Sequence, residues 1–177
     1  MKNVQLDHTS HHAGHRKLPI CFLAHNIELP INVGSLFRIA DAFGIEMLYL
    51  TGTSAMPPNS KLRKTSRATE NNVPFQHEKN PLEVVERLKA EGYKIISLEI
   101  TSSSIDISDL SLSAADKVCL ILGSENTGVN QELLNASDIT THIPMLGQNS
   151  SLNVATASAI AGFEIMKRYL PEQAACL

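Results

Sequence analysis

The stretch LILGSENTG (residues 120–128) decides the fold that this sequence predicts, because an apolar run gives way there to a glycine-flanked polar turn. The stretches HNIELPINVGSLFRIADAFG (25–44) and IPMLGQNSSLNVATASAIAG (143–162) have the same character. Each places short polar side chains and glycines where a strand passes into a helix. In open α/β proteins this junction is where ligands bind. Three such junctions in one chain favour an enzyme.

Apolar runs of strand length alternate with helical segments along the chain. The run ICFLA (20–24) suits a buried parallel strand. The helix after it is expected to begin at Asn32, a good N-cap residue, and to end at Gly44. The alternation predicts a mostly parallel sheet with helices on both faces. Further strands are expected at 45–50, 73–77, 94–100, 117–122 and 139–143, helices at 81–92, 129–136 and 151–169, and a Ser-rich loop at 101–113.

Length and composition indicate one ordinary globular domain. The 177 residues suffice for a single core, which we expect at 19–170, with a flexible arm at 1–18 and a tail at 171–177. No apolar run reaches the roughly 18 residues of a spanning helix, and the first residues lack the pattern of a signal peptide. The three cysteines form no CxxC, so we expect reduced thiols and a cytoplasmic protein.

Charge gives a mixed indication about nucleic acid. The net charge of −3 disfavours a protein that bulk charge alone holds on nucleic acid. Locally, however, four basic residues fall within seven positions that contain no acid. This segment is either a solvated surface or a patch that contacts phosphate. Its basic residues are Lys61, Arg63, Lys64 and Arg67.

The N-terminal arm contains four of the seven histidines, His8, His11, His12 and His15. Their spacing could bring ring nitrogens together around a metal. No cysteine accompanies them, and no periodic pattern would hold them rigid. A mobile arm is therefore favoured, and no metal site is expected.

Common nucleotide and hydrolase motifs are absent. Gly123 and Gly128 have the spacing of a phosphate loop, yet Val129 and Asn130 stand where Lys and Ser or Thr are required. The GxGxxG fingerprint of dinucleotide binding and the GxSxG of many hydrolases do not occur. These absences argue against a nucleoside-triphosphatase, a typical dinucleotide enzyme and a hydrolase.

Five polar residues at the strand ends each have an ordinary explanation. Glu125, in the turn after residue 122, would be favoured by the dipole of the helix at 129–136. Ser151, Asn32 and Asn153 would serve as helix caps. Arg38 could pair with Asp41 or Glu28. Their recurrence at three strand ends, with glycines that let a ligand approach the backbone, favours a binding site instead. The five are Asn32, Arg38, Glu125, Ser151 and Asn153.

Over residues 20–169 the chain resembles the SpoU/TrmH family of SPOUT RNA methyltransferases. Three motifs in order carry the resemblance. N-x-G-x-x-x-R lies at 32–38, and L-G-x-E-x-x-G lies at 122–128. I-P-M-x-G followed by S-L-N-V lies within 143–154.

The resemblance implies transfer of a methyl group from S-adenosylmethionine to a ribose 2′-hydroxyl of RNA, with tRNA favoured over rRNA. It also implies a deep trefoil knot near the C-terminus and a homodimer whose catalytic arginine reaches the partner's cofactor. Neither a metal nor a membrane is implied. Many relatives carry an added RNA-binding domain, so this chain is expected to be a minimal enzyme.

The same resemblance assigns the site. The expected catalytic residues are the five polar residues above. Arg38 either accepts the hydroxyl proton or orients phosphate and stabilises developing negative charge, since a guanidinium is a poor base in water. The basic segment 61–67 would bind RNA. The residues expected at the cofactor are Leu98, Glu99, Gly123, Ile143, Met145 and Leu152.

Two other functions stay open. One is a catalytically silent RNA-binding module of the same fold, against which the intact set of polar residues argues. The other is an α/β enzyme with a different nucleotide cofactor, which predicts an unknotted sheet and no thermal shift with S-adenosylhomocysteine.

Overall fold

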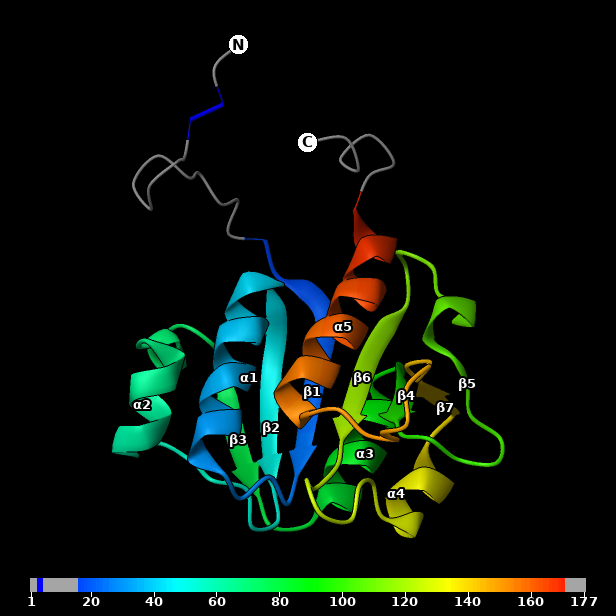
Figure 1. Cartoon of the computed structure of the whole chain (residues 1–177), viewed down its shortest axis with the longest axis horizontal. Helices are drawn as coiled ribbons and strands as arrows, with labels where there is room; N and C mark the ends of the chain where they lie inside the picture. Colours follow the sequence, from blue (N-terminus) through cyan, green and yellow to red (C-terminus); the bar gives the residue numbers. More distant parts are fainter. Residues whose placement is uncertain (1–2, 5–15, 171–177) are drawn as a thin grey trace.

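A computed structural model describes residues 3–4 and 16–170, in which all strand pairs of one seven-stranded sheet are parallel (Figure 1). The strand order is β3-β2-β1-β6-β4-β7-β5. The predicted parallel α/β architecture is thereby confirmed. The strands are β1 (Leu18–His25), β2 (Ile45–Thr51), β3 (Phe75–Glu78), β4 (Tyr93–Leu98), β5 (Ile105–Asp106), β6 (Lys117–Leu122) and β7 (Ile139–His142).

Helices cover both faces of this sheet. Adjacent residues of a strand point to opposite faces, so Phe22 of β1 packs in one core and Leu23 in the other. The first core contains the buried faces of α1 (Pro30–Ala42), α2 (Ser60–Ser66) and α5 (Val154–Met166). The second contains those of α3 (Pro81–Ala90) and α4 (Gln131–Ala136). Single 3-10 turns lie at η1 (Thr69–Asn71), η2 (Ile107–Asp109) and η3 (Lys167–Tyr169).

The start of α1 differs from the sequence prediction. Leu29 occupies the N-cap position without a side-chain cap, and Pro30 is the first helical residue. Proline suits this position because its φ is already helical and it has no N–H to satisfy. Asn32 therefore lies inside the first turn, where it is buried, and its side chain is available for contacts outside the helix.

Two segments contain regular structure that was not anticipated. Residues 60–66 form α2, which Asn59 caps by accepting from the backbone N–H groups of Lys61 and Leu62. The segment 101–113 is not a loop throughout, because Ile105 and Asp106 pair with β7 and η2 follows. The elements in both segments are short, so none gives a clear hydrophobic period.

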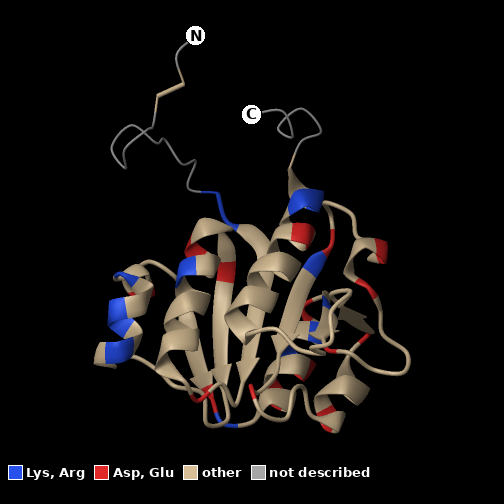
Figure 2. Ribbon diagram, viewed as in Figure 1, with Lys and Arg blue, Asp and Glu red and all other residues tan. Residues whose placement is uncertain are grey.

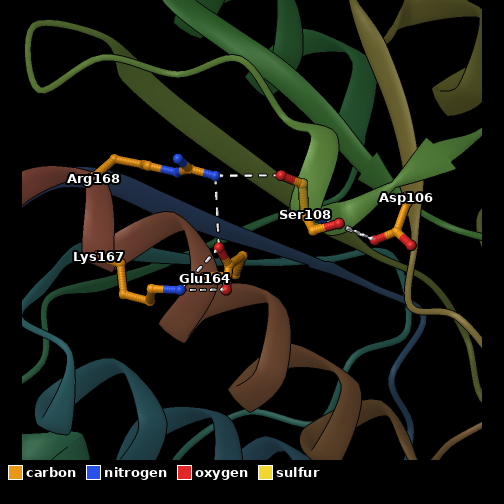
Figure 3. A network of polar contacts seen from close by, with 5 residues as sticks. All are labelled: Asp106, Ser108, Glu164, Lys167 and Arg168. Carbon is orange, nitrogen blue, oxygen red and sulfur yellow. Dashed lines mark hydrogen bonds and ion pairs between the residues drawn. The ribbon is translucent and has the colours of Figure 1, made fainter.

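Polar contacts fasten the C-terminal end of α5 to the connection between β5 and β6 (Figure 3). Glu164 accepts from Lys167 at 3.0 Å and pairs with Arg168 at 3.6 Å. Arg168 also donates to the backbone carbonyl of Ser108 at 3.4 Å. The trefoil knot in this part of the chain stays a prediction. Within the described residues, no helix is both long and apolar enough to cross a membrane.

Candidate active site

A hollow of about 560 Å³ opens at the carboxyl ends of the central strands. Segments that follow β1, β4, β6 and β7 line it, which is the location expected for a ligand site in a parallel sheet. Its volume falls in the range of small-molecule sites. The lining combines apolar side chains with hydroxyl, amide and carboxylate groups, as a cofactor with an aromatic ring and a polar sugar requires.

Asn32 joins three distant segments at this hollow. Its Nδ2 donates to Oε1 of Glu125 at 2.6 Å, and its Oδ1 accepts from Nδ2 of Asn153 at 3.1 Å. Asn153 in turn caps α5 by accepting from the N–H of Ala155 at 3.0 Å. Asn32 is only 6% exposed, and both the nitrogen and the oxygen of its side-chain amide are hydrogen-bonded. These bonds connect α1, the β6–α4 turn and the start of α5.

The turn at 123–128 is closed by its own backbone. Ser124 and Gly128 exchange two backbone hydrogen bonds, at 2.9 and 3.1 Å. A Cβ on Gly123 would lie 2.1 Å from the carbonyl carbon of Gly128. Gly128 has φ of +66°, and a Cβ there would meet the Glu99 carboxylate. These two glycines therefore permit close approach of protein segments, and the expectation that they also admit a ligand to the backbone stays a prediction.

The side-chain carboxylate of Glu99 accepts two backbone hydrogen bonds. Its Oε2 accepts from the N–H of Val129 at 2.9 Å, and its Oε1 accepts from the N–H of Ile100 at 3.0 Å. The carboxylate thus connects the end of β4 to the segment that leads into α4. This role was missed because sequence alone does not show that β4 and β6 are neighbours.

Every residue expected at the cofactor lines the hollow, and so do four of the five expected catalytic residues. Ser151 is exposed in the segment before α5 and has no side-chain hydrogen bond within residues 16–170. Leu29, Ile100 and Asn126 also line the hollow but were not anticipated; their positions just after strand ends were the available signal. The expected residues in the lining are Asn32, Leu98, Glu99, Gly123, Glu125, Ile143, Met145, Ser151, Leu152 and Asn153.

Arg38 does not reach this hollow within one chain. It is exposed and borders a separate shallow depression on α1 with Ile39 and Phe43. Neither Asp41 nor Glu28 forms an ion pair with it among the described residues. The single chain therefore presents the arginine outward.

The basic segment lies beside α1. All four of its basic residues are exposed. Lys61, Arg63 and Lys64 lie on α2, and Arg67 is its C-cap (Figure 2). No ion pair within residues 16–170 involves them. The two helices approach closely at Gly34, where an added Cβ would lie 2.6 Å from the carbonyl oxygen of Leu62. This glycine of the first motif therefore brings the basic helix against α1.

The histidines of the N-terminal arm (His8, His11, His12 and His15) lie outside the described residues. In the described part of the chain, no group of three or more His, Cys, Asp or Glu could hold a metal ion. Cys21 and Cys119 are buried and free.

Comparison with known proteins identifies the family. The model of the SpoU rRNA Methylase family matches residues 19–163. The tRNA (guanosine(18)-2′-O)-methyltransferase of Escherichia coli strain K12 is 28% identical over 154 residues, which cover 85% of this chain and 63% of that protein. The 23S rRNA (guanosine(2553)-2′-O)-methyltransferase RlmP of Bacillus subtilis is 30% identical over 139 residues, or 78% of this chain and 54% of that one.

A solved structure agrees with these relatives. The SpoU methyltransferase AviRb from Streptomyces viridochromogenes, in complex with the cofactor AdoMet, superposes with a TM-score of 0.78 at 25% identity. The match covers 86% of this chain and 61% of AviRb. The chain thus spans less than two thirds of the length of these relatives. Because the family model matches most of its residues, the chain belongs to the SpoU rRNA methylase family.

Proposed function

We propose that this protein transfers a methyl group from S-adenosylmethionine to a ribose 2′-hydroxyl of RNA, with tRNA favoured over rRNA. The observation that carries the proposal is the contact of Asn32 with Glu125 and Asn153 at the mouth of a cofactor-sized hollow. Family membership supports the reaction. The name of the Escherichia coli relative supports tRNA, whereas that of RlmP shows that rRNA is also used within the family.

The hollow fits S-adenosylmethionine, which supplies an activated methyl group when bound. Leu98, Ile143 and Leu152 would provide apolar surface for its adenine. The Glu99 carboxylate and the backbone beside Gly123 and Met145 would provide polar surface for its remaining groups. The hydrogen bonds of Glu99 and of the 123–128 turn keep this surface formed before any ligand arrives, which lowers the ordering cost of binding.

Methyl transfer is an in-line displacement, so the protein must align the ribose oxygen and then remove its proton. The bonds that Asn32 makes would hold Glu125 at the hollow, and Ser151 has a hydroxyl available for the ribose. Arg38 would orient an RNA phosphate and stabilise the negative charge that develops on the oxygen, while the hydroxyl proton would pass to water. Since it faces away from the hollow of its own chain, a second subunit is needed to bring it there.

A homodimer therefore forms part of the proposal. Large apolar side chains are exposed on α1 and α5, which lie side by side on one face of the sheet (Figure 1). Ile31 is 57% exposed, Ile160 41% and Phe163 50%, and Phe43 stacks at a tilt against Phe163. Such a surface is typical of an interface. Pairing two copies through it would bury these side chains beside Arg38.

The basic residues of α2 would contact RNA phosphates close to the active site. They are free of ion pairs in the described structure and lie on a helix that packs against α1. Dimerisation would place two such helices on one RNA-binding surface.

We also propose that the protein acts in the cytoplasm, where unbridged cysteines such as Cys21 and Cys119 are usual.

The test is to incubate the purified protein with methyl-labelled S-adenosylmethionine and either bulk tRNA or rRNA. Label retained as a 2′-O-methylnucleoside after nuclease digestion is the expected result, with the higher yield from tRNA. RNA binding without transfer to either RNA would instead identify a catalytically silent module. Mapping ribose methylation in cells with and without the gene would then identify the nucleotide.

A further inference from the structure

His25, the last residue of β1, is buried beside the proposed active site but lies outside its lining, with 7% of its surface exposed. Its ring contacts three side chains from three segments. Nδ1 is 3.0 Å from Oγ1 of Thr51, at the end of β2. Nε2 is 3.0 Å from Nδ2 of Asn26 and 3.4 Å from Nδ2 of Asn130, the N-cap of α4. The ring therefore bridges the end of β2 and the segments that follow β1 and β6.

The neighbours of His25 determine its protonation state. The Oδ1 of Asn26 accepts from the backbone N–H of Thr53 at 2.9 Å, and the Oδ1 of Asn130 accepts from that of Leu133 at 2.9 Å. Both amide NH₂ groups are thus directed at Nε2, which must accept and carry no proton. The Oγ1 of Thr51 donates to the carbonyl of Ala24, so it accepts from an Nδ1 that carries the proton. The network is satisfied only by a neutral ring.

The backbone around the ring is strongly constrained. Asn26 has φ of +57°, a left-handed conformation that costs energy for a residue other than glycine. An added Cβ on Gly52 would lie 2.1 Å from Oδ1 of Asn26. The turn after β2 therefore closes directly onto this residue. Such strain persists only where the surroundings determine the conformation, as the bonds to His25 and Thr53 do here.

The segments that His25 connects are the ones that bring Asn32 and Glu125 together. Asn26 begins the connection that leads into α1, where Asn32 lies. Asn130 directly follows the segment that contains Glu125 and ends at Val129. The Asn32–Glu125 bond joins these two connections at the hollow, and His25 joins them at a second point.

We propose that neutral His25 is a positioning residue, which holds the β1–α1 connection and the N-terminus of α4 together so that Asn32 and Glu125 stay aligned for catalysis. The catalytic part of this inference rests on the proposed function. Protonation of the ring would place an N–H against the two amide NH₂ groups and separate the two connections. Activity should therefore fall when His25 gains a proton.

Within the described residues, no charged side chain is hydrogen-bonded to the ring of His25. The ionisable groups on neighbouring segments are Glu28, which accepts from Thr53, His77 and Glu78 on β3, Glu125 in the segment before Asn130, and Glu132 in the first turn of α4. None is among the ring's hydrogen-bond partners within the described residues. Burial lowers the pKa of His25 below its usual value, which agrees with a ring kept neutral at physiological pH.

The decisive variant is His25→Gln. A glutamine side chain can accept from the two asparagines and donate to Thr51, yet it does not titrate. We expect its kcat at pH 8 to stay within about threefold of wild type. The wild-type kcat should fall as the pH approaches the pKa of His25, which burial places below that of an ordinary histidine, whereas the variant should lack this fall. His77→Gln, which removes an exposed histidine whose Nε2 lies 3.3 Å from the carbonyl of Gly52, is the matched control and should keep the wild-type profile.

His25→Ala removes both acceptor and donor. We expect kcat to fall about 10- to 100-fold at pH 8, the size of effect that small misplacements of reacting groups produce. Affinity for S-adenosylhomocysteine, by contrast, should change only a few fold. Identical acid limbs in wild type and His25→Gln would overturn the proposal, as would an alanine variant with full kcat.

A measurement without substrate separates this inference from the proposed function. In NMR spectra of the free protein, the backbone amides of Glu125 and Asn126 should shift with the titration of the His25 ring. Amides that do not follow this titration would overturn the inference, even in an active enzyme. Amides that do follow it would support the inference even if no RNA were methylated, a result that would refute only the proposed function.

Discussion

Asn32 and Arg38 belong to one motif on one helix, yet their side chains lie in opposite environments. Asn32 is buried and hydrogen-bonded to residues 93 and 121 positions away. Arg38 is exposed, without an ion pair in the described structure, and borders a different hollow. One part of the motif thus completes the fold of its own chain. The other faces a surface that only an RNA or a second subunit would cover. Stability and turnover should therefore be separable along α1.

The largest expected effect is on turnover, from Arg38→Ala. We expect kcat to fall about 100- to 1,000-fold, as when a group that stabilises developing charge is lost. The melting temperature and the affinity for S-adenosylhomocysteine should stay near wild type, because the side chain makes no ion pair within residues 16–170. Arg38→Lys keeps the charge but not the planar fork, and it should recover only part of the activity. Loss of cofactor affinity in Arg38→Ala would contradict the separation.

Subunit mixing sharpens the same comparison. If Arg38 acts across a dimer, a heterodimer of Arg38→Ala and Glu125→Gln has one intact site, formed by the hollow of the first subunit and the arginine of the second. Random mixing of the two inactive proteins should then restore about a quarter of wild-type activity. If Arg38 acts within its own chain, mixing restores nothing. The control is the activity of each variant measured without the other.

Asn32→Ala should affect stability more than any change at Arg38. The substitution removes two hydrogen bonds and leaves the amide of Asn153 without its partner, so we expect a loss of about 1–3 kcal/mol in the free energy of unfolding. Urea denaturation measures this loss. Ser35→Ala on the same helix, where an exposed hydroxyl donates to the carbonyl of Ile31, should change stability by a few tenths of a kcal/mol. Equal stabilities of the two variants would contradict the role assigned to Asn32.

The strand ends were predicted well because a buried parallel strand appears in the sequence as a continuous apolar run. In parallel sheets, ligand-binding side chains follow the point where such a run ends. Runs 117–122 and 45–50 coincide with β6 and with most of β2. Residues just beyond the end of β6, such as Gly123 and Glu125, were therefore correctly expected at the hollow. Asn32 was misjudged as a cap because Pro30 already starts the helix one turn earlier.

What sequence could not show depends on which strands are neighbours. The hydrogen bond from the N–H of Val129 to the Glu99 carboxylate requires β4 to lie beside β6. The hydrogen bonds of His25 require three separate segments to meet. Each case involves long-range contact, which periodicity within one element does not encode.

The basic helix gives the next smaller effect. The double substitution Arg63→Ala with Lys64→Ala should weaken tRNA binding about tenfold at low salt and reduce the salt slope by about one unit per lost phosphate contact. Filter binding across a salt series measures both quantities. Lys89→Ala with Lys167→Ala removes the same charge from ion-paired positions elsewhere and serves as the control. Equal losses in the two double variants would show that only total charge matters.

The smallest effect should come from Arg168, although Figure 3 shows it in a network. It pairs with Glu164 at 3.6 Å and donates to the carbonyl of Ser108 at 3.4 Å, both long contacts made by a side chain 35% exposed. Exposed ion pairs contribute at most about 1 kcal/mol and are screened by salt. Arg168→Ala should therefore lower the free energy of unfolding by less than this amount, and by less again in 0.5 M salt. A larger, salt-insensitive loss would mean that this contact holds the end of α5 in place, so that the C-terminal region depends on it as the hollow depends on Asn32.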